Sequence, residues 1–256
     1  MNNIIDTVII PAAGAGKRIK EQLDITYSKE MILVNNKPCI RYIIDEAIAS
    51  GIKNIIVIVH ESKKDLITYL NSLKLDINLT ISFQNTQNGI AKAIYSAKQY
   101  INTNYFGVML GDDVFTPSKI VFKQLLKLFN KNNQNVIGVL EIADVNLIKK
   151  YSSMKIESLV GNTFKILDII EKPQEDEIYS MYASQGRYIF SKNIFSVIEK
   201  QNTGINNEFQ LTDSIRLLLK EEPCAGLILD GIHYDFGSID GLKQALRNRI
   251  NFNIKK

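Results

Sequence analysis

Short apolar runs, rich in β-branched residues, recur through the first half of the chain and limit what it can fold into. Helical patterns lie between them, at about 40–48, 63–73, 90–101 and 118–130, and Gly51 follows the first of these where a C-terminal cap belongs. Because the runs are continuous rather than alternating, they are typical of strands covered on both faces. Strand alternating with helix predicts a parallel, doubly wound α/β sheet over at least the first 140 residues. The runs are TVII at 7–10, NIIVIV at 54–59, LTISF at 79–83, YFGVML at 105–110 and NVIGVL at 135–140.

The second half is less regular. Residues 164–170 and 186–190 have strand-like composition, and helical patterns cover 192–200, 210–222 and 237–250. No Pro-, Gly- or Ser-rich linker separates the halves, so we expect one α/β domain over 1–256 whose second half completes the sheet and one wall of a cleft. Ligands of open sheets bind beyond the carboxyl ends of the strands. The strand-to-loop junctions are therefore where chemistry is expected.

Composition excludes several classes of function. The 31 Lys and Arg residues are scattered and give a formal charge of +4, with no basic stripe or reading motif for nucleic acid, so a small anionic substrate fits better. The cysteines form no CxxC pair and the two histidines are far apart, which argues against structural zinc and a disulfide framework. No apolar run approaches the roughly 18 residues of a spanning helix, and the N-terminus has no secretion signal. We expect a cytoplasmic protein that binds neither membrane nor nucleic acid.

The first junction reads PAAGAGKR, from Pro11 to Arg18. Gly14 and Gly16 let the backbone approach a ligand closely and expose N–H groups to an anion, and Arg18 can form two hydrogen bonds to a phosphate. The sequence is not a Walker A loop, and Ile19 breaks the dinucleotide pattern. On this segment alone, a phosphate cradle and a simple turn are equally good interpretations.

Acidic residues mark two further junctions. LGDDVF places Asp112 and Asp113 at a strand end, and because adjacent strand residues point in opposite directions, only one carboxylate should face the cleft. That carboxylate could hold Mg²⁺, which prefers one or two carboxylates plus substrate phosphates. The alternative is an Asx-turn or a cap before a helix at Pro117. HYDFGS offers a second carboxylate in Asp235.

Two more segments carry charged residues at element boundaries. IEKP places Glu171 beside Lys172 at an apparent strand end, which is by itself more typical of a surface terminus. NEFQLTD adds Glu208 at the start of a helix, where Thr212 or Asp213 could simply be capping. Each segment is weak evidence alone.

The order of the motifs is more specific than any one of them. PAAGAGKR, SKEM at 28–31, KP at 37–38, GI at 89–90, LGDD, EKP, GRY, NEFQLTD and HYDFG follow one another from about residue 5 to about 250. This series resembles the bacterial UTP–glucose-1-phosphate uridylyltransferases, within the sugar-1-phosphate nucleotidylyltransferases. The resemblance implies a Rossmann-like mixed, mainly parallel sheet flanked by helices. It also implies a nucleotide-binding half at about 1–140, and a sugar-binding half with a C-terminal helix at about 141–256.

The resemblance assigns roles position by position. The loop from Ala12 to Arg18 would wrap the nucleoside triphosphate, with Arg18 and Lys29 on its phosphates, and Gln84 and Gly89 would read the uracil. Glu171 and Lys172 would hold the hydroxyls and phosphate of the sugar, in a pocket completed by Gly186 and Glu208. Asp112 and Asp235 would bind Mg²⁺. The implied nucleotide-binding residues are Ala12, Ala13, Gly14, Gly16, Glu30, Gln84, Gly89 and Asp112, and the implied catalytic set is Arg18, Lys29, Asp112 and Lys172.

The implied reaction is magnesium-dependent transfer of UMP from UTP to glucose 1-phosphate by a dimer or tetramer. The chain departs from the family pattern at Ser28, where a proline is usual, and at Ala91 and Lys92, where a glycine and often a histidine stand. A thymidylyl- or cytidylyltransferase, a glycosyltransferase of similar fold and a catalytically silent sugar-nucleotide-binding paralogue are the alternatives.

Overall fold

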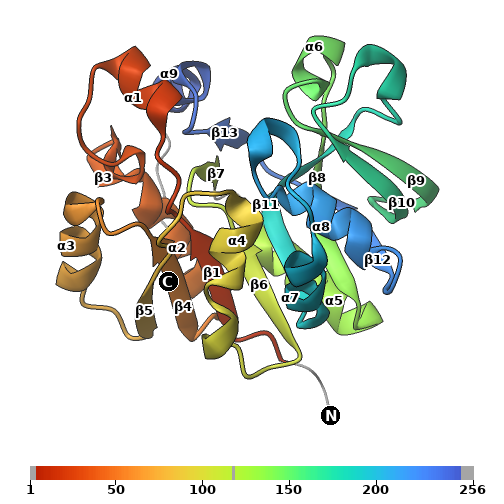
Figure 1. Cartoon of the computed structure of the whole chain (residues 1–256), viewed down its shortest axis with the longest axis horizontal. Helices are drawn as coiled ribbons and strands as arrows, with labels where there is room; N and C mark the ends of the chain where they lie inside the picture. The colour runs from red at the N-terminus through yellow and green to blue at the C-terminus, as the bar shows by residue number, and fades with distance from the viewer. Residues whose placement is uncertain (1–3, 117–118, 249–256) are drawn as a thin grey trace.

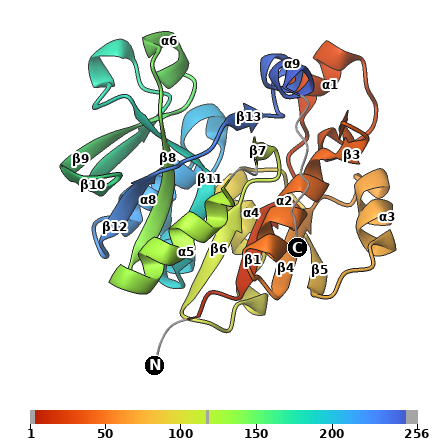
Figure 2. The ribbon, with the colours of Figure 1, turned by 180° about the vertical axis from the view of Figure 1, so that it is seen from behind.

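The computed structural model describes residues 4–116 and 119–248. Its centre is a nine-stranded sheet, with helices on both faces (Figures 1 and 2). In spatial order the strands are β5 (Asn78–Phe83), β4 (Asn54–Val59), β1 (Thr7–Pro11), β6 (Tyr105–Met109), β11 (Tyr182–Ser191), β8 (Asn135–Glu141), β12 (Cys224–Ile228), β10 (Thr163–Glu171) and β9 (Ser152–Val160).

The strand directions confirm a mixed, mainly parallel sheet. Strands β5, β4, β1 and β6 are parallel neighbours, as the first half of the sequence predicts. Strand β11, from the second half, lies between β6 and β8 and is antiparallel to both, while β12 is parallel to β8. Strand β10 runs antiparallel to β12 and β9. The second half therefore enters the middle of the sheet as well as extending its edge.

Helices cover the two faces in two sets. Helices α2 and α5 lie over the face seen in Figure 2, and α4, α7 and α8 over the face seen in Figure 1. Short pairs of strands lie outside the sheet: β2 (Leu33–Val34) with β3 (Lys37–Pro38), and β7 (Asp113–Phe115) with β13 (His233–Asp235). The helices are α1 (Lys17–Leu23), α2 (Cys39–Ala49), α3 (Lys64–Ser72), α4 (Ile90–Tyr95), α5 (Val121–Asn132), α6 (Val145–Ile148), α7 (Asn193–Lys200), α8 (Leu211–Leu218) and α9 (Ile239–Arg247).

The continuous apolar runs serve both faces at once. In β1, Val8 and Ile10 belong to the buried cluster under α2 and α5, whereas Ile9 belongs to the cluster under α4, α7 and α8. Successive strand residues point to opposite faces, so a strand covered on both sides needs an apolar residue at every position. Both cysteines, Cys39 and Cys224, are buried and free. Within the described residues, no helix is long and apolar enough to cross a membrane.

Two strands of the sheet were not predicted. Strand β9 is an edge strand whose second half is mostly exposed, so it lacks an apolar run. Strand β12 is short and contains Gly226, where a Cβ would come within 2.2 Å of the Phe164 ring. The helix expected over 90–101 ends at Tyr95 and is followed by a 3₁₀ turn. The expected helix start near Pro117 and the last two residues of the expected C-terminal helix lie outside the described residues.

A buried ion pair joins the sheet to α2. Arg187 of β11 is fully buried, and its Nε and Nη2 donate to the two carboxylate oxygens of Glu46 at 3.1 and 2.5 Å. Arg187 also donates to the backbone carbonyls of Gly186 and Asp113, both at 2.9 Å. Glu46 accepts a further bond from the backbone N–H of Phe122 at the start of α5. Every one of these groups is therefore paired inside the protein.

We expect Arg187→Met to lower the free energy of unfolding by about 3–5 kcal/mol, because it leaves the Glu46 carboxylate buried without its cation. Urea unfolding measures the change. The matched control is Arg216→Met, which removes an arginine whose partner is Asp168 and whose side chain is 48% exposed; its cost should be about 1 kcal/mol or less. Equal losses of unfolding free energy in the two variants would contradict the conclusion that the buried pair of Arg187 with Glu46 stabilises the fold more than a surface pair does.

Candidate active site

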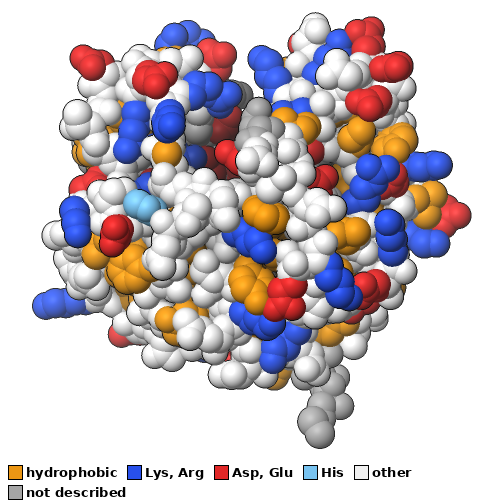
Figure 3. Space-filling view, viewed as in Figure 1, with side chains coloured by type: hydrophobic (Ala, Val, Ile, Leu, Met, Phe, Trp, Pro, Cys, Tyr) orange, Lys and Arg blue, Asp and Glu red, His pale blue; other side chains and the backbone are white. Residues whose placement is uncertain are grey.

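Two cavities adjoin at the carboxyl ends of β1 and β6, where the sequence predicts a site. The first encloses about 500 Å³ and the second about 270 Å³, and Ile90 and Asp112 line both. Figure 3 shows this face of the molecule hollowed between the part that carries α1 and α9 and the part that carries α6. The first cavity is lined by Lys29 and by all of the expected nucleotide-binding residues: Ala12, Ala13, Gly14, Gly16, Glu30, Gln84, Gly89 and Asp112.

The loop after β1 forms one wall of the first cavity. Ala12 and Ala13 are buried, whereas no described residue other than the two chain neighbours of Gly14 lies within 4 Å of where a Cβ on Gly14 would sit. Gly16 adopts a left-handed φ of 65°, which a residue with a Cβ rarely takes. A Cβ there would also lie 3.1 Å from Cδ of Lys29. The loop therefore leaves open space at Gly14 and a close approach to Lys29 at Gly16.

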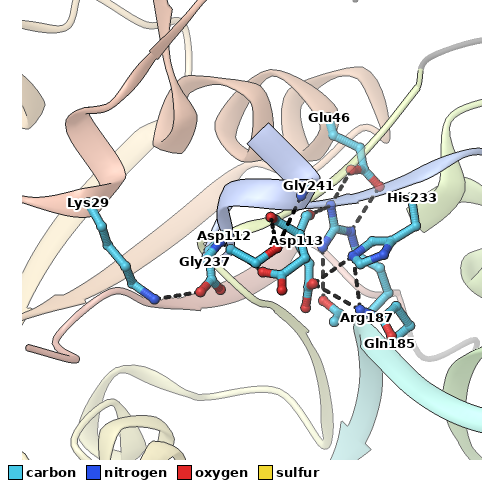
Figure 4. Close-up of polar contacts among 12 residues, drawn as sticks. Lys29, Glu46, Asp112, Asp113, Gln185, Arg187, His233, Gly237 and Gly241 are labelled. Atoms are coloured by element: carbon cyan, nitrogen blue, oxygen red, sulfur yellow. Dashed lines mark hydrogen bonds and ion pairs between the residues drawn. The ribbon is translucent and has the colours of Figure 1, made fainter. Parts of the chain in front are cut away.

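Lys29 spans from the 3₁₀ helix of SKEM to the end of β6. Its Nζ lies 2.5 Å from Oδ2 of Asp112, with the two side chains 19% and 28% exposed (Figure 4). Burial alone would raise the pKa of Asp112, but the Lys29 ammonium lowers it overall. Burial likewise opposes the charge of Lys29, and the carboxylate of Asp112 raises its pKa overall. Both groups are therefore charged at neutral pH.

Ser28 holds the SKEM segment in place. Its backbone N–H and its hydroxyl donate to the two carboxylate oxygens of Asp65, at 2.7 and 2.6 Å, and the residue is buried. Proline, the usual residue of the family pattern here, has neither donor. This departure is therefore matched by a bidentate contact with α3, and the position of Lys29 is kept by different chemistry.

Glu30 belongs to a buried ion pair. Lys63 Nζ lies 2.8 and 2.7 Å from its two carboxylate oxygens and donates to the Ala12 carbonyl at 2.7 Å. Both side chains are at most 3% exposed, and burial lowers the pKa of Lys63 despite the opposite charge of Glu30. Lys63 thus ties the loop after β1 to SKEM. Sequence reasoning missed it, because nothing in ESKKD tells which lysine points inward.

The residues expected to read a base lie on the far wall of the first cavity. Gln84 is buried, and its Nε2 donates to Oδ1 of Asn88 and to the Gly89 carbonyl, at 3.1 and 3.2 Å. Gly89 has a φ of 117°, and a Cβ there would lie 2.5 Å from the Phe209 carbonyl oxygen. Only glycine fits this backbone-to-backbone contact. Gln87, not predicted, donates from Nε2 to the Ala13 carbonyl across the cavity at 2.5 Å.

The two other departures from the family pattern lie beside Gly89 and face the same loop. The backbone N–H of Ala91 donates to the Phe209 carbonyl at 3.1 Å. The ammonium of Lys92 lies 4.5 Å from the centroid of the Phe209 ring, within the range of a cation–π contact. These contacts fasten the start of α4 to NEFQLTD, so the two cavities share one packed wall.

Asp112 and Asp235 converge from positions more than a hundred residues apart. In the pairing of β7 with β13, Asp235 lies opposite Asp113, and the N–H of Phe236 donates to the Asp112 carbonyl at 2.8 Å. A Cβ on Gly237 would lie 2.9 Å from Asp235 Oδ1 and 3.0 Å from Asp112 Oδ2, so both oxygens face the same small space. Burial raises the pKa of Asp235, and the charges of Asp113 and Asp112 raise it further.

This pair of carboxylates fits a hard divalent cation. Mg²⁺ is held by one or two carboxylates together with substrate phosphates rather than by an all-protein cage. Among the residues that the structure describes, no group of three or more His, Cys, Asp or Glu side chains is arranged to hold a metal. Asp112 and Asp235 could supply the two carboxylates of such a donor set.

Asp113 lines the second cavity together with Asp112, so the expectation that only one of the two carboxylates faces the cleft is not met, but its contacts differ from those of Asp112. It is 8% exposed and its Oδ1 contacts Nε2 of His233 at 2.7 Å and accepts a bond from Nε2 of Gln185 at 2.9 Å (Figure 4). Gly186 packs directly against it, with a φ of 53°, and a Cβ there would lie 2.4 Å from Asp113 Oδ2. The close contact with Asp113 is by itself a reason for glycine at position 186.

The residues expected to bind a sugar are divided between the cavities. Glu171 and Gly186 line the second cavity, together with Asp235, whereas Glu208 is exposed and lines the first. Burial raises the pKa of Glu171, although its carboxylate accepts a bond from the Thr212 hydroxyl at 3.1 Å. Thr212 therefore does more than begin a helix.

Two of the expected catalytic cations lie outside both cavities. Arg18 is exposed on α1. Its Nη2 donates to the carbonyl of Gly237, two residues after Asp235, at 3.3 Å. Lys172 is exposed, has a left-handed φ of 45° and donates its N–H to the carbonyl of Tyr151, a residue of the second cavity. A non-glycine residue in this conformation is uncommon and clusters at functional sites.

Comparison with known proteins gives consistent matches over almost the whole chain. The sequence model of the nucleotidyl transferase family matches residues 7–251. UTP–glucose-1-phosphate uridylyltransferase YngB of Bacillus subtilis (strain 168) is 30% identical, over 93% of this chain and 86% of that protein. The UTP–glucose-1-phosphate uridylyltransferase of Staphylococcus haemolyticus (strain JCSC1435) is 31% identical, over 91% and 88%. A crystal structure of UDP-glucose pyrophosphorylase complexed with UDP-glucose is similar with a TM-score of 0.89 at 27% identity, over 96% of this chain and 98% of that one.

The packing of Gly186 gives a testable consequence for the site. We expect Gly161→Ala, at a φ of 62° with open space around it, to cost about 1 kcal/mol from backbone strain alone. Gly186→Ala should cost about 1–3 kcal/mol more, because its methyl group must displace the Asp113 carboxylate. Urea unfolding of both variants measures the difference. Equal losses of unfolding free energy in the two variants would show that glycine is needed at position 186 only for its backbone conformation.

Proposed function

The chain belongs to the nucleotidyl transferase family, and from this premise we propose that it transfers UMP from UTP to glucose 1-phosphate, giving UDP-glucose and pyrophosphate. The observation that supports this most directly is the junction of two cavities at Asp112. One cavity has the glycine loop and Lys29, as a nucleotide needs, and the other has Glu171 and Gly186, expected for a sugar. Relatives of about 30% identity carry the name of this reaction.

The reaction needs no nucleophile from the protein. A phosphate oxygen of glucose 1-phosphate attacks the α-phosphorus of UTP in line, a new P–O bond forms, and the bond to the β-phosphate oxygen breaks to release pyrophosphate. The attacking oxygen is already an anion, so the protein must bring two polyanions together and stabilise the charge that spreads in the transition state. In this proposal Lys29, Arg18 and Lys172 supply positive charge around the phosphates.

The neutral parts of the first cavity position the nucleotide. The loop from Ala12 to Gly16 offers small side chains against the base and ribose, and Lys63 and Glu30 fix that loop from behind. Gln84 and Gly89 stand on the opposite wall and would read the uracil. Glu208 lies on this first cavity near its junction with the second, so it would contact the sugar from the nucleotide side.

We propose Mg²⁺ as the cofactor, held by Asp112 and Asp235. When bound, it would neutralise phosphate charge and orient the reacting phosphates. Asp235 supports this assignment because its charge is disfavoured by Asp113 and Asp112, a repulsion that a cation relieves. The expected dimer or tetramer, the cytoplasmic location and the division of the chain into a nucleotide half and a sugar half stay predictions.

A panel of UTP, dTTP and CTP with sugar 1-phosphates, followed by pyrophosphate release, tests the proposal. We expect the highest kcat/KM with UTP and glucose 1-phosphate. A preference for dTTP or CTP would identify a thymidylyl- or cytidylyltransferase, since uracil and thymine differ by one methyl group, which pockets reject only modestly. UDP-glucose hydrolysis without pyrophosphate dependence would indicate a glycosyltransferase. Binding of UDP-glucose without pyrophosphate exchange would indicate a silent paralogue.

Replacing either proposed metal ligand should stop turnover without unfolding the protein. We expect Asp112→Asn and Asp235→Asn each to lower kcat by at least about 100-fold, because each removes charge that would locate the metal beside the phosphates. Asp230→Asn is the matched control, since Asp230 is exposed and pairs with Lys119 at the surface; it should keep full activity. Near-normal rates in both Asp112 and Asp235 variants would remove the metal assignment.

A further inference from the structure

The ion pair between Lys29 and Asp112 occupies the place where a metal would bind. The Lys29 ammonium lies 2.5 Å from Asp112 Oδ2, and this is the same oxygen that shares the space beside Gly237 with Asp235 Oδ1. A divalent cation on these two carboxylates would meet the ammonium at short range, and like charges so close together repel. Lys29 and the metal therefore compete for one carboxylate oxygen.

The backbone beside Lys29 is held by contacts that do not involve its ammonium group. Ser28 fixes the backbone through two hydrogen bonds to Asp65. The stem of Lys29 passes close to Gly16, within the wall of the first cavity, so a triphosphate bound against that loop would offer the ammonium a second anionic partner. The neighbouring acid, Glu30, is already bound by Lys63 through both oxygens.

We propose that Lys29 is a resident cation of the metal site. It neutralises Asp112 while the nucleotide is absent and is drawn to the phosphates when a nucleoside triphosphate binds, which frees Oδ2 for the metal. Free divalent metal then binds weakly to the protein alone, and metal and nucleotide bind together, each strengthening the other by the same factor. The inference rests on the proposed function for the identity of the nucleotide, whereas the contact between Lys29 and Asp112 is observed directly.

Binding measurements without turnover test this role. Mn²⁺ is the probe, with the free ion counted by electron paramagnetic resonance in the absence of nucleotide. We expect Lys29→Met to bind Mn²⁺ about tenfold more tightly than the unaltered protein, within the usual range of coupling between sites. Lys29→Gln should do the same, and thermal unfolding shows whether both variants fold. The matched control is Lys53→Met, which removes an exposed lysine beside the start of β4 and should leave Mn²⁺ binding unchanged.

The proposal also requires an opposite effect on nucleotide. Titration calorimetry with UTP in excess EDTA should give weaker binding for Lys29→Met than for the unaltered protein and for Lys53→Met. The double variant Lys29→Met with Asp112→Asn should lose the gain in Mn²⁺ affinity. The inference is overturned if Lys29→Met binds Mn²⁺ no more tightly, or if the double variant keeps the gain. Failure of the unaltered protein to bind UTP would count against the proposed function instead, and the Mn²⁺ result would still decide the role of Lys29.

Discussion

The guanidinium of Arg187 is the contact on which the acidic part of the site depends. It is fully buried. It donates to the carboxylate of Glu46 in α2, to the carbonyl of Asp113 at the start of β7 and to the carbonyl of Gly186 in β11. Because every partner is an acceptor inside the protein, their positions are coupled. Strand β7 follows Asp112 directly, so the same guanidinium sets where the first carboxylate leaves the sheet.

Charge is balanced locally around the cavities. Lys63 neutralises Glu30 behind the glycine loop, and Lys29 neutralises Asp112 in front of it. Within the described residues Asp235 forms no ion pair of its own, and its pKa is raised by burial and by its acidic neighbours. The contrast separates two kinds of buried charge. The Lys63 pair maintains the loop, whereas the charge around Asp112 and Asp235 is incompletely balanced and suits a ligand that brings its own cation.

The predictions succeeded where local pattern and tertiary packing agree. The continuous runs of β1, β4, β6 and β8 form strands because each is covered on both faces, and the partly exposed run of β5 forms the edge beside β4. The expected nucleotide loop lines a cavity because it follows β1. The pattern failed for β9, where an edge strand needs no apolar run, and for β12, where Gly226 makes room for Phe164. Lys63 and Gln87 were missed because their neighbours in space come from other segments.

The sequence by itself determined the α/β class, the segments of the first half that form strands and the chemical types present at each strand end, since periodicity and turn chemistry are local properties. Strand alternation predicted that only one of Asp112 and Asp113 would face the cleft, whereas both line the second cavity. Only the tertiary structure decided that β11 enters the sheet between β6 and β8, that Asp235 meets Asp112, and that the Lys29 ammonium pairs with the Asp112 oxygen beside Gly237. Those contacts join residues far apart in the chain, and their geometry is set by how the two halves pack together.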